Sequence, residues 1–210
     1  MIKKFTTILA QLKNNTKSFK MLILLDLFLV TGSTLVDWHW LSSVKWYLLP
    51  FAPICSLYPL LLVVWLILYR LKKNIPPFLT SFIFIAIAAY GPMAWVYFPS
   101  YMVWYGFDWI IFGNIFWVTA YALQAFVIKT EIKPLPAYQY FIIIAYFLFK
   151  DYADFYLGSF WDIVNDYPST LKYLLLVSML SLQLLAIMVC LNAAFPHVFR
   201  WLRSHLKSVH

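Results

Sequence analysis

The sequence predicts an all-α membrane protein, a bundle of six transmembrane helices with both termini in the cytoplasm. Of the 210 residues, 64% are hydrophobic and only 11% are charged, whereas roughly 25% of the residues of a soluble domain are charged. The apolar residues form six separate segments of about the length that a bilayer-spanning helix needs. The basic residues gather in alternate connections between those segments, as they do in multi-span membrane proteins.

The first two spans are predicted at residues 19–36 and 54–69. The first follows a lysine-rich stretch and resembles a signal peptide, but Asp26 interrupts it and no small-residue cleavage site follows it. We therefore interpret it as a retained span. The second is short, but the apolar residues 46–52 before it can extend it at an angle. Pro59 inside it predicts a kink, which neighbouring helices can accommodate.

Prolines and charged residues delimit the other four spans, because both are frequent where a helix begins or ends. The third span ends before Pro99, and Pro92 inside it predicts a second kink. The fourth lies between charged residues, the fifth follows Pro136 and the sixth follows Pro168. These spans cover residues 78–98, 108–128, 137–157 and 171–195.

The distribution of charge predicts the orientation of the spans. With the N-terminus in the cytoplasm, most of the sixteen basic residues fall on the inner side and most of the eight acidic residues on the outer side. This arrangement satisfies the positive-inside rule at every connection, whereas five spans would place a basic cluster outside. The chain is then divided into a basic amphipathic cytoplasmic segment, a six-helix membrane domain and a basic cytoplasmic tail, at residues 1–18, 19–195 and 196–210.

The two basic ends mix lysine or arginine with apolar side chains, a composition typical of segments that lie on anionic lipid. For residues 1–18 a solvated basic tail fits equally well. The net charge of +8 does not indicate a nucleic-acid partner, because the basic residues lie at span ends. The expected partners are the bilayer and the anionic lipids at the basic termini, with a membrane-protein complex as an option, and the expected location is the plasma membrane.

Polar residues near the outer ends of the spans form the first candidate site. Charged side chains within a membrane are costly and often functional. Counting about 1.5 Å per residue along each span places His39, Asp108 and Asp162 at this depth, together with the residues that we predict to bind a ligand: Asp37, Asn114, Lys150, Asp151 and Asp154.

Lys150 and Asp151 share one broad helix face with Asp154, because they precede it by four and three positions. One interpretation is a polar cavity that binds a charged or zwitterionic headgroup or solute. The other is a self-neutralised pair of Lys150 and Asp154 at the membrane boundary, with the lysine reaching to water.

A second polar group is predicted near the inner face. It consists of Asp26, Gln124 and Asn192, with Gln183 closer to the middle of the membrane. We expect Asp26 to make an interhelical hydrogen bond with Gln124 or Asn192. A proton-carrying role in a coupled transporter is the alternative.

No metal or cofactor site is predicted. His39 stands two residues after Asp37, but no second histidine falls on the same side of the membrane. The sequence contains no glycine-rich phosphate loop, no metal-spaced Cys/His set and no nucleophile elbow. Cys55 and Cys190 are predicted on opposite halves of the bilayer, too far apart for a disulfide, which needs Cα atoms within about 7 Å. Both are expected to be free thiols.

Several short motifs carry a family resemblance. They are Gly32 with Trp38-His39-Trp40, Pro50-Phe51-Ala52-Pro53, Tyr90-Gly91 with Trp95, Ala122 with Gln124, and Lys150-Asp151-Tyr152-Ala153-Asp154-Phe155 with Pro168 and Leu171. Through these motifs the segment 21–195 resembles the uncharacterised bacterial integral membrane proteins typified by YpjA. The resemblance implies that Asp151 and Asp154 belong to a shared design. Lys150 replaces the amide of that family, and Ile54 stands where the family tends to have an acid.

The sequence therefore predicts a non-enzymatic integral membrane protein that holds a polar ligand or lipid headgroup at its outer face. It would act as a small transporter or as a subunit of a larger complex. Two alternatives stay open. One is a membrane enzyme that acts on lipid headgroups with outer carboxylates as acid and base, and the other is a structural assembly partner.

Overall fold

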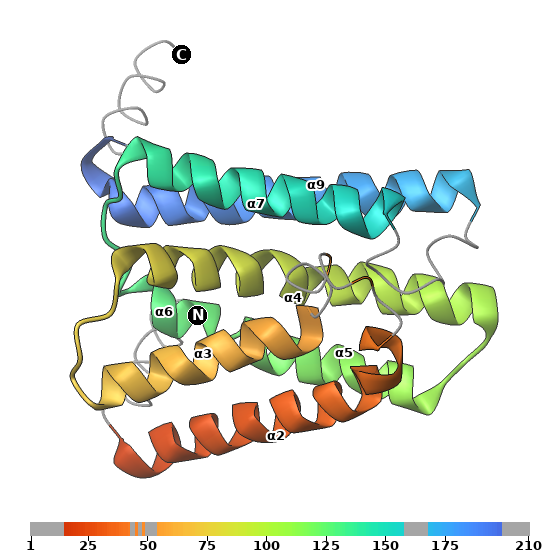
Figure 1. Ribbon diagram of the computed structural model, residues 1–210, viewed down its shortest axis with the longest axis horizontal. Coiled ribbons are helices and arrows are strands. Elements are labelled where there is room, and N and C mark those ends of the chain that lie inside the picture. Colours follow the sequence, from red (N-terminus) through yellow and green to blue (C-terminus); the bar gives the residue numbers. More distant parts are fainter. Residues whose placement is uncertain (1–14, 43–44, 46–47, 49–53, 158–167, 199–210) are drawn as a thin grey trace, which may run out of the picture.

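The computed structural model describes residues 15–42, 45, 48, 54–157 and 168–198. The described part is all-α, as predicted, and contains no strand. A helix covers each of the six predicted segments, and the fourth is broken into two (Figure 1). The helices are α2 (Thr16–Leu41), α3 (Ile54–Arg70), α4 (Pro77–Tyr105), α5 (Trp109–Ala122), α6 (Ala125–Lys129), α7 (Ala137–Tyr156) and α9 (Ser169–Ala194).

Three stretches of the described chain are long and apolar enough to cross a membrane: Pro77–Tyr105, Trp109–Lys129 and Ser169–Ala194. Most of the predicted basic ends, residues 1–18 and 196–210, lies outside the described residues. The structure therefore supports a helical protein with membrane-spanning segments.

Local side chains explain where two of the helices begin. The side-chain oxygen of Asn15 accepts the backbone N–H groups of Lys17 and Ser18, at 3.0 and 3.3 Å, and so caps α2. The carboxylate of Asp108 accepts the N–H groups of Ile110 and Ile111, at 2.6 and 3.0 Å, and caps α5 in the same way. Such caps satisfy N–H groups that the first helical turn leaves without a partner.

Helix α4 runs past the predicted end of its span. Pro99 was expected to stop it, yet the helix continues to Tyr105. The hydroxyl of Ser100 donates to the carbonyl of Val96 at 2.7 Å. This bond gives a partner to one carbonyl group in the turn whose backbone hydrogen bonding the proline disturbs. Beyond the proline, Tyr101 and Met102 still pack against the core, and this packing favours continued helix.

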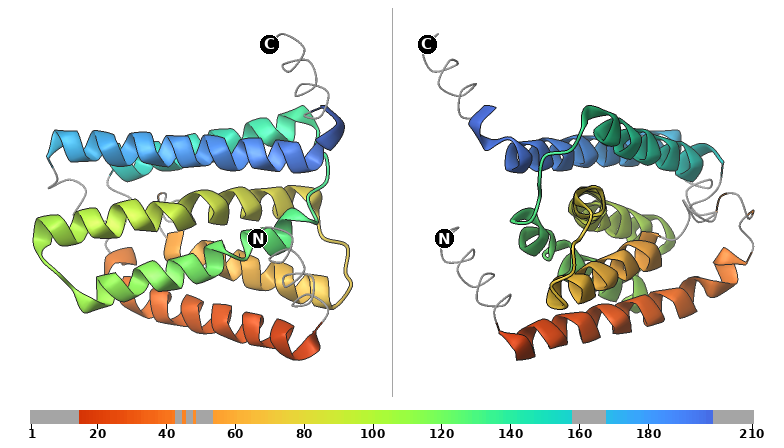
Figure 2. Two further views of the ribbon diagram at one scale, coloured as in Figure 1. Left: turned by 180° about the vertical axis from the view of Figure 1, so that it is seen from behind. Right: turned by 60° about the vertical axis from the view of Figure 1, so that its left-hand side comes forward.

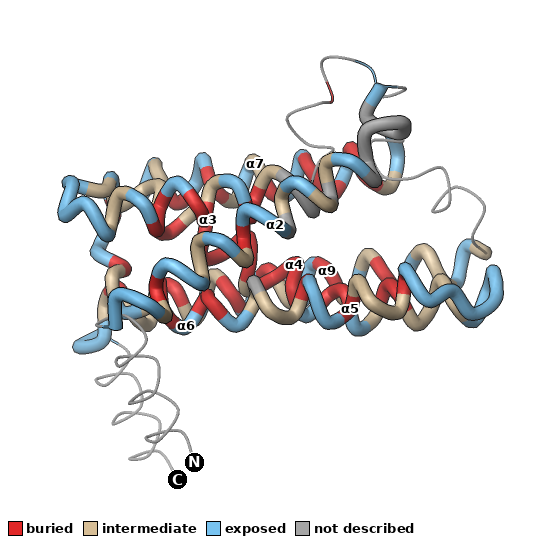
Figure 3. The backbone as a smooth tube through the Cα atoms, turned by 90° about the horizontal axis from the view of Figure 1, so that it is seen from below, coloured by how far each residue is buried: buried red, intermediate tan, exposed pale blue. Residues whose placement is uncertain are grey.

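Helix α4 lies at the centre of the bundle. It packs against α3, α5, α6 and α9, while α2 packs on α3 and α7 on α9. The views in Figures 1 and 2 agree that α7 and α9 lie on one side of α4 and that α2 and α3 lie on the other. Buried residues follow the inward sides of the helices and exposed residues follow the outward sides (Figure 3).

The outward sides of the helices are themselves apolar. Leu24 and Phe28 of α2, Phe141 of α7 and Leu184 of α9 are all exposed. A soluble protein rarely exposes so much continuous apolar surface. Lipid would cover these side chains at no cost, so this surface is the one expected of a bundle in a bilayer.

Helices α4 and α5 approach closely at Gly91. A Cβ atom at this position would overlap the Cβ of Ala122 on the neighbouring helix. Gly113, on α5, has no other atom within 4 Å of the corresponding point.

We predict that Gly91→Ala destabilises the protein and that Gly113→Ala does not. Both changes favour the helix through propensity, but only the first overpacks an interface, at a cost of about 1–3 kcal/mol. Thermal unfolding of the purified variants in detergent measures the difference. Equal melting temperatures for the two variants would mean that α4 and α5 do not pack at this point.

Candidate functional site

Helix α7 turns three charged side chains into the bundle. Lys150, Asp151 and Asp154 are only 1%, 2% and 4% exposed. The helix exposes apolar residues such as Phe141 and Leu148 on its other side. The charged face of α7 therefore packs inward, and its apolar face is the one that meets the surroundings.

Asp151 joins three helices. Its Oδ1 atom accepts a hydrogen bond from the hydroxyl of Tyr90, on α4, at 3.0 Å, and another from Nε2 of Gln183, on α9, at 2.9 Å. The same Nε2 also donates to the Tyr90 hydroxyl at 3.1 Å. The three side chains form a closed triangle of hydrogen bonds between α4, α7 and α9.

Lys150 and Asp154 complete the group, which we call the charged cluster: Lys150, Asp151, Asp154, Tyr90 and Gln183. The ammonium nitrogen of Lys150 lies 2.6 Å from Oδ2 of Asp154, one helical turn away. It also lies 5.2 Å from the centre of the Tyr90 ring, within the range of a cation–π interaction. Tyr90 therefore contacts both the ion pair through its ring and Asp151 through its hydroxyl.

The charged cluster has more negative than positive charge. It holds two carboxylates and one ammonium group, so it carries one net negative charge when all three are ionised. The Oδ2 atom of Asp151 is buried and has no hydrogen-bond partner among the described residues. An unpaired polar atom away from water is costly, and such an atom suits a proton or a small cation.

Several aromatic rings pack together beside the charged cluster. The ring of Tyr58, on α3, lies 5.4 Å from that of Tyr90 and 6.4 Å from that of Phe147. Phe82, on α4, stacks on Phe147 at 5.3 Å and meets Tyr146 edge-on at 5.0 Å. Through Tyr90 and Phe147, these packed rings adjoin the charged cluster.

The predicted outer group does not come together as one site. Asn114 is half-buried on α5, which lies on the opposite side of α4 from α7 (Figure 1). Asp37 belongs to α2, but its side chain, like that of His39, lies outside the described residues, as does Asp162. Asp108 caps α5. Among the members whose side chains the structure describes, those of α7 are the ones that lie together.

The charged residues of α7 pair as one of the two interpretations held, but not where it placed them. Lys150 pairs with Asp154, yet it is buried and does not reach to water. Gln183, predicted close to the middle of the membrane, bonds to Asp151 of the predicted outer group. Tyr90 and Gln183 lie near the middle of α4 and α9, so the charged cluster lies within the bundle and not at one end of it.

The inner group is partly present. Nε2 of Gln124 donates to Oδ1 of Asp26 at 2.7 Å, so the expected interhelical hydrogen bond links α2 to the break between α5 and α6. Asn192 lies on α9, on the opposite side of α4 from α2 in both Figures 1 and 2. It is therefore not part of the same group.

Sequence reasoning missed Tyr90. Tyr90 entered the sequence analysis only as part of a family motif, whereas its hydroxyl donates to Asp151. Its position in the middle of an apolar span, far from either interface, is the signal that could have identified it.

Within the described residues no three His, Cys, Asp or Glu side chains are arranged to hold a metal ion. Cys190 is a buried free thiol, as predicted, and the side chain of Cys55 lies outside the described residues. In comparisons with protein-family models, curated proteins and solved structures, no match to this chain is found.

We predict that Lys150→Met is strongly destabilising and that adding Asp154→Leu restores most of the loss. Removing the lysine leaves the carboxylate of Asp154 buried without its cation, at a cost of about 3–5 kcal/mol, whereas replacing both partners by apolar residues is often neutral. Unfolding in detergent, with the exposed Lys45→Met as a control, measures these differences. A single Lys150→Met variant as stable as the control would contradict the buried ion pair.

Proposed function

We propose that the chain is a six-span membrane protein, with both ends cytoplasmic, that binds a proton or small cation at Asp151 and couples its binding to the passage of a polar solute. The observation that carries this proposal is the buried Oδ2 atom of Asp151, which lacks a partner in the described part of the chain and belongs to a cluster with one more acid than base. Ionisable residues inside a membrane protein are by default candidates for such ion pathways.

The arrangement of the helix ends supports the six-span topology. The beginnings of α2, α4 and α7 and the ends of α3, α6 and α9 gather at one end of the bundle, on the left in Figure 1. The guanidinium of Arg70, at the end of α3, donates to Thr16 Oγ1, at the start of α2, at 2.9 Å. Basic residues concentrate at this end, which the positive-inside rule assigns to the cytoplasm: Lys17, Lys20, Arg70, Lys72, Lys73, Lys129 and Lys133.

The shorter and more charged helices are compatible with this topology. Helix α3 has 17 residues and is about 25 Å long at 1.5 Å per residue, which a modest local thinning of the bilayer accommodates. Helix α7 has 20 residues, and its three charged side chains in the cluster are turned away from lipid.

The burial of the carboxylates favours a small ligand over a lipid headgroup. An enzyme that acts on headgroups, or a headgroup site at the outer face, needs acids that a headgroup can reach, but Asp151 and Asp154 are enclosed. A purely structural cluster would be better balanced, because an unpaired buried charge costs stability. Asp151 and Asp154 also lie in the run that carries the resemblance to YpjA-like proteins, so we include membership of that group in the proposal.

For the function, we predict that Asp151→Asn abolishes ligand-dependent charge movement. Purified protein in liposomes is exposed to a jump in proton, Na⁺ or K⁺ concentration on a solid-supported membrane. The wild type should give a transient current with one of the three, and the variant should reduce it at least tenfold. The control is Asp108→Asn, which preserves the cap of α5. A wild type silent to all three ions, or an undiminished current in the variant, refutes the proposal.

For the topology, we predict that cysteines at two positions react from opposite sides. In a background with Cys55 and Cys190 replaced by serine, Lys73→Cys should react with a membrane-impermeant maleimide only from the cytoplasmic side. Lys45→Cys should react only from the outer side. Labelling of both from the same side would require the chain between them to cross the membrane an even number of times or not at all, which contradicts the proposed single crossing by α3.

A further inference from the structure

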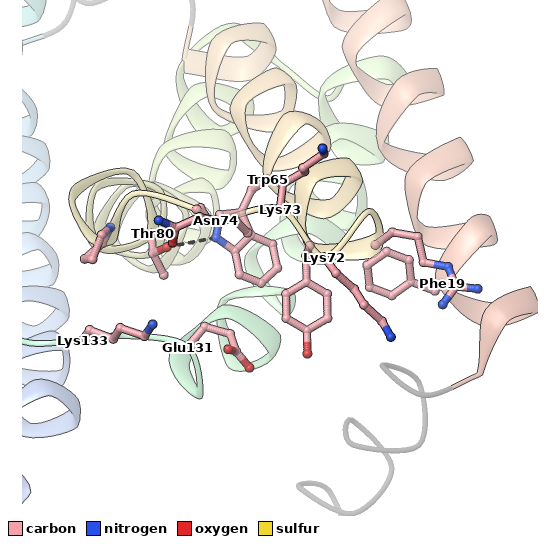
Figure 4. Close-up of a pocket in the computed structure, with 12 residues that line it drawn as sticks. Phe19, Trp65, Lys72, Lys73, Asn74, Thr80, Glu131 and Lys133 are labelled. Atoms are coloured by element: carbon pink, nitrogen blue, oxygen red, sulfur yellow. Dashed lines mark hydrogen bonds between the residues drawn. The ribbon is translucent and has the colours of Figure 1, made fainter.

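A second polar site lies at the basic end of the bundle. It is a cavity of about 460 Å³ between the start of α2, the end of α3, the start of α4 and the segment that joins α6 to α7. We call it the basic pocket and define it by the residues Trp65, Arg70, Lys72, Lys73, Glu131 and Lys133 (Figure 4). None of these residues belongs to the charged cluster.

The charge of the basic pocket is strongly positive. Arg70, Lys72, Lys73 and Lys133 line it, against the single carboxylate of Glu131 among its described lining residues. Glu131 accepts a hydrogen bond from the neighbouring Thr130 hydroxyl at 3.3 Å. Four cations around one cavity repel one another unless an anion lies between them, so the basic pocket suits an anionic ligand.

The walls of the basic pocket are held in place. The indole N–H of Trp65 donates to Thr80 Oγ1 at 3.1 Å, and the ring stacks on Tyr69 at 5.1 Å with an interplanar angle of 12°. Tyr69 stacks in turn on Phe19 at 6.0 Å. In Figure 4 the indole of Trp65 lies between Lys72 on one side and Glu131 and Lys133 on the other. The basic side chains of the pocket therefore lie beside aromatic rings that are held by stacking and by a hydrogen bond.

The end of α3 directs the cationic side chains. The N–H of Lys73 bonds to the carbonyl of Leu68 at 3.0 Å and the N–H of Lys72 to that of Tyr69 at 3.1 Å, the pattern of a Schellman motif. Lys72 has a φ of 51°, in a region where glycine is usual. A lysine here places a charge at the pocket where a glycine would have ended the helix with less strain.

Exposed apolar side chains are close in sequence to residues of the basic pocket. Leu71, next to Arg70 in the chain, is 60% exposed, and Met21, two residues after Phe19, is 69% exposed. Such side chains can contact acyl chains while the cations hold a headgroup. We propose that the basic pocket binds a phosphate-bearing anion, most simply the phosphate of an anionic phospholipid. Arginine and lysine together are the usual recognition set for phosphate, and basic pockets between membrane helices bind such headgroups.

Native mass spectrometry of the full chain tests this proposal. Protein is released from nanodiscs that contain equal amounts of phosphatidylglycerol and phosphatidylcholine, and the retained lipid is counted. The wild type should retain phosphatidylglycerol in preference. In the double variant Lys72→Gln/Lys133→Gln the preference for phosphatidylglycerol should fall about thirtyfold, because each basic residue near an anionic lipid raises the affinity roughly fivefold. The matched variant Lys45→Gln/Lys172→Gln should keep it.

An arginine variant and a competition with inorganic phosphate complete the experiment. Lys72→Arg/Lys133→Arg keeps the charge and should keep the preference, and it replaces the glutamine variant if the latter does not fold. Inorganic phosphate at 10 mM, a roughly physiological order of concentration chosen as a competitor, should displace the lipid only if the ligand is a soluble phosphate. No preference in the wild type, or equal loss in the matched variant, overturns the proposal whatever the outcome at Asp151.

Discussion

The burial of three charges on one face of α7 is the constraint on which the arrangement of α4, α7 and α9 depends. A charge enclosed in a protein within a membrane is tolerated only if neighbouring groups pair with it. Tyr90 and Gln183 supply hydrogen bonds to Asp151 from two other helices, and Lys150 neutralises Asp154. Rotating α7 about its axis by half a turn would break both hydrogen bonds from Asp151 to the other two helices and would turn the Lys150–Asp154 pair out of the bundle, so the charged cluster fixes the orientation of α7.

The two sides of α4 pack in different ways. Toward α5 the backbones approach closely through Gly91 and Ala122, and Trp95 donates to Thr119 across the interface at 2.8 Å. Toward α7, the rings of Phe82 and Tyr90 on α4 pack against the ring of Phe147 on α7. The helix that carries the charged cluster is therefore held by side chains, which can rearrange with less loss of packing than a close backbone interface. A site that must open to admit an ion requires such a helix.

Most of the fold could be predicted from the sequence, because hydropathy, proline and charge act locally along the chain. The bond between Asp26 and Gln124 could also be anticipated, since both residues were assigned to one depth. The grouping of Asn114 with Asp151 failed because residue spacing does not encode the order of helices around a bundle. Asp151 was predicted at the outer end although it bonds to Gln183, near the middle of α9, because counting along ideal spans ignores how far each helix extends beyond the membrane boundary.

The basic pocket and the charged cluster are neutralised by different groups. This difference helps to tell whether each site has a structural or a functional role. The basic pocket lies at the end of the bundle, where water and lipid phosphates can balance its cations. The charged cluster is enclosed by protein groups, and those within residues 15–42, 54–157 and 168–198 leave Oδ2 of Asp151 without a partner. A cluster retained for stability alone would lose nothing by replacing Asp151 with a neutral residue that still accepts from Tyr90 and Gln183. The additional carboxylate is therefore the strongest indication that the charged cluster binds something that the chain itself does not provide.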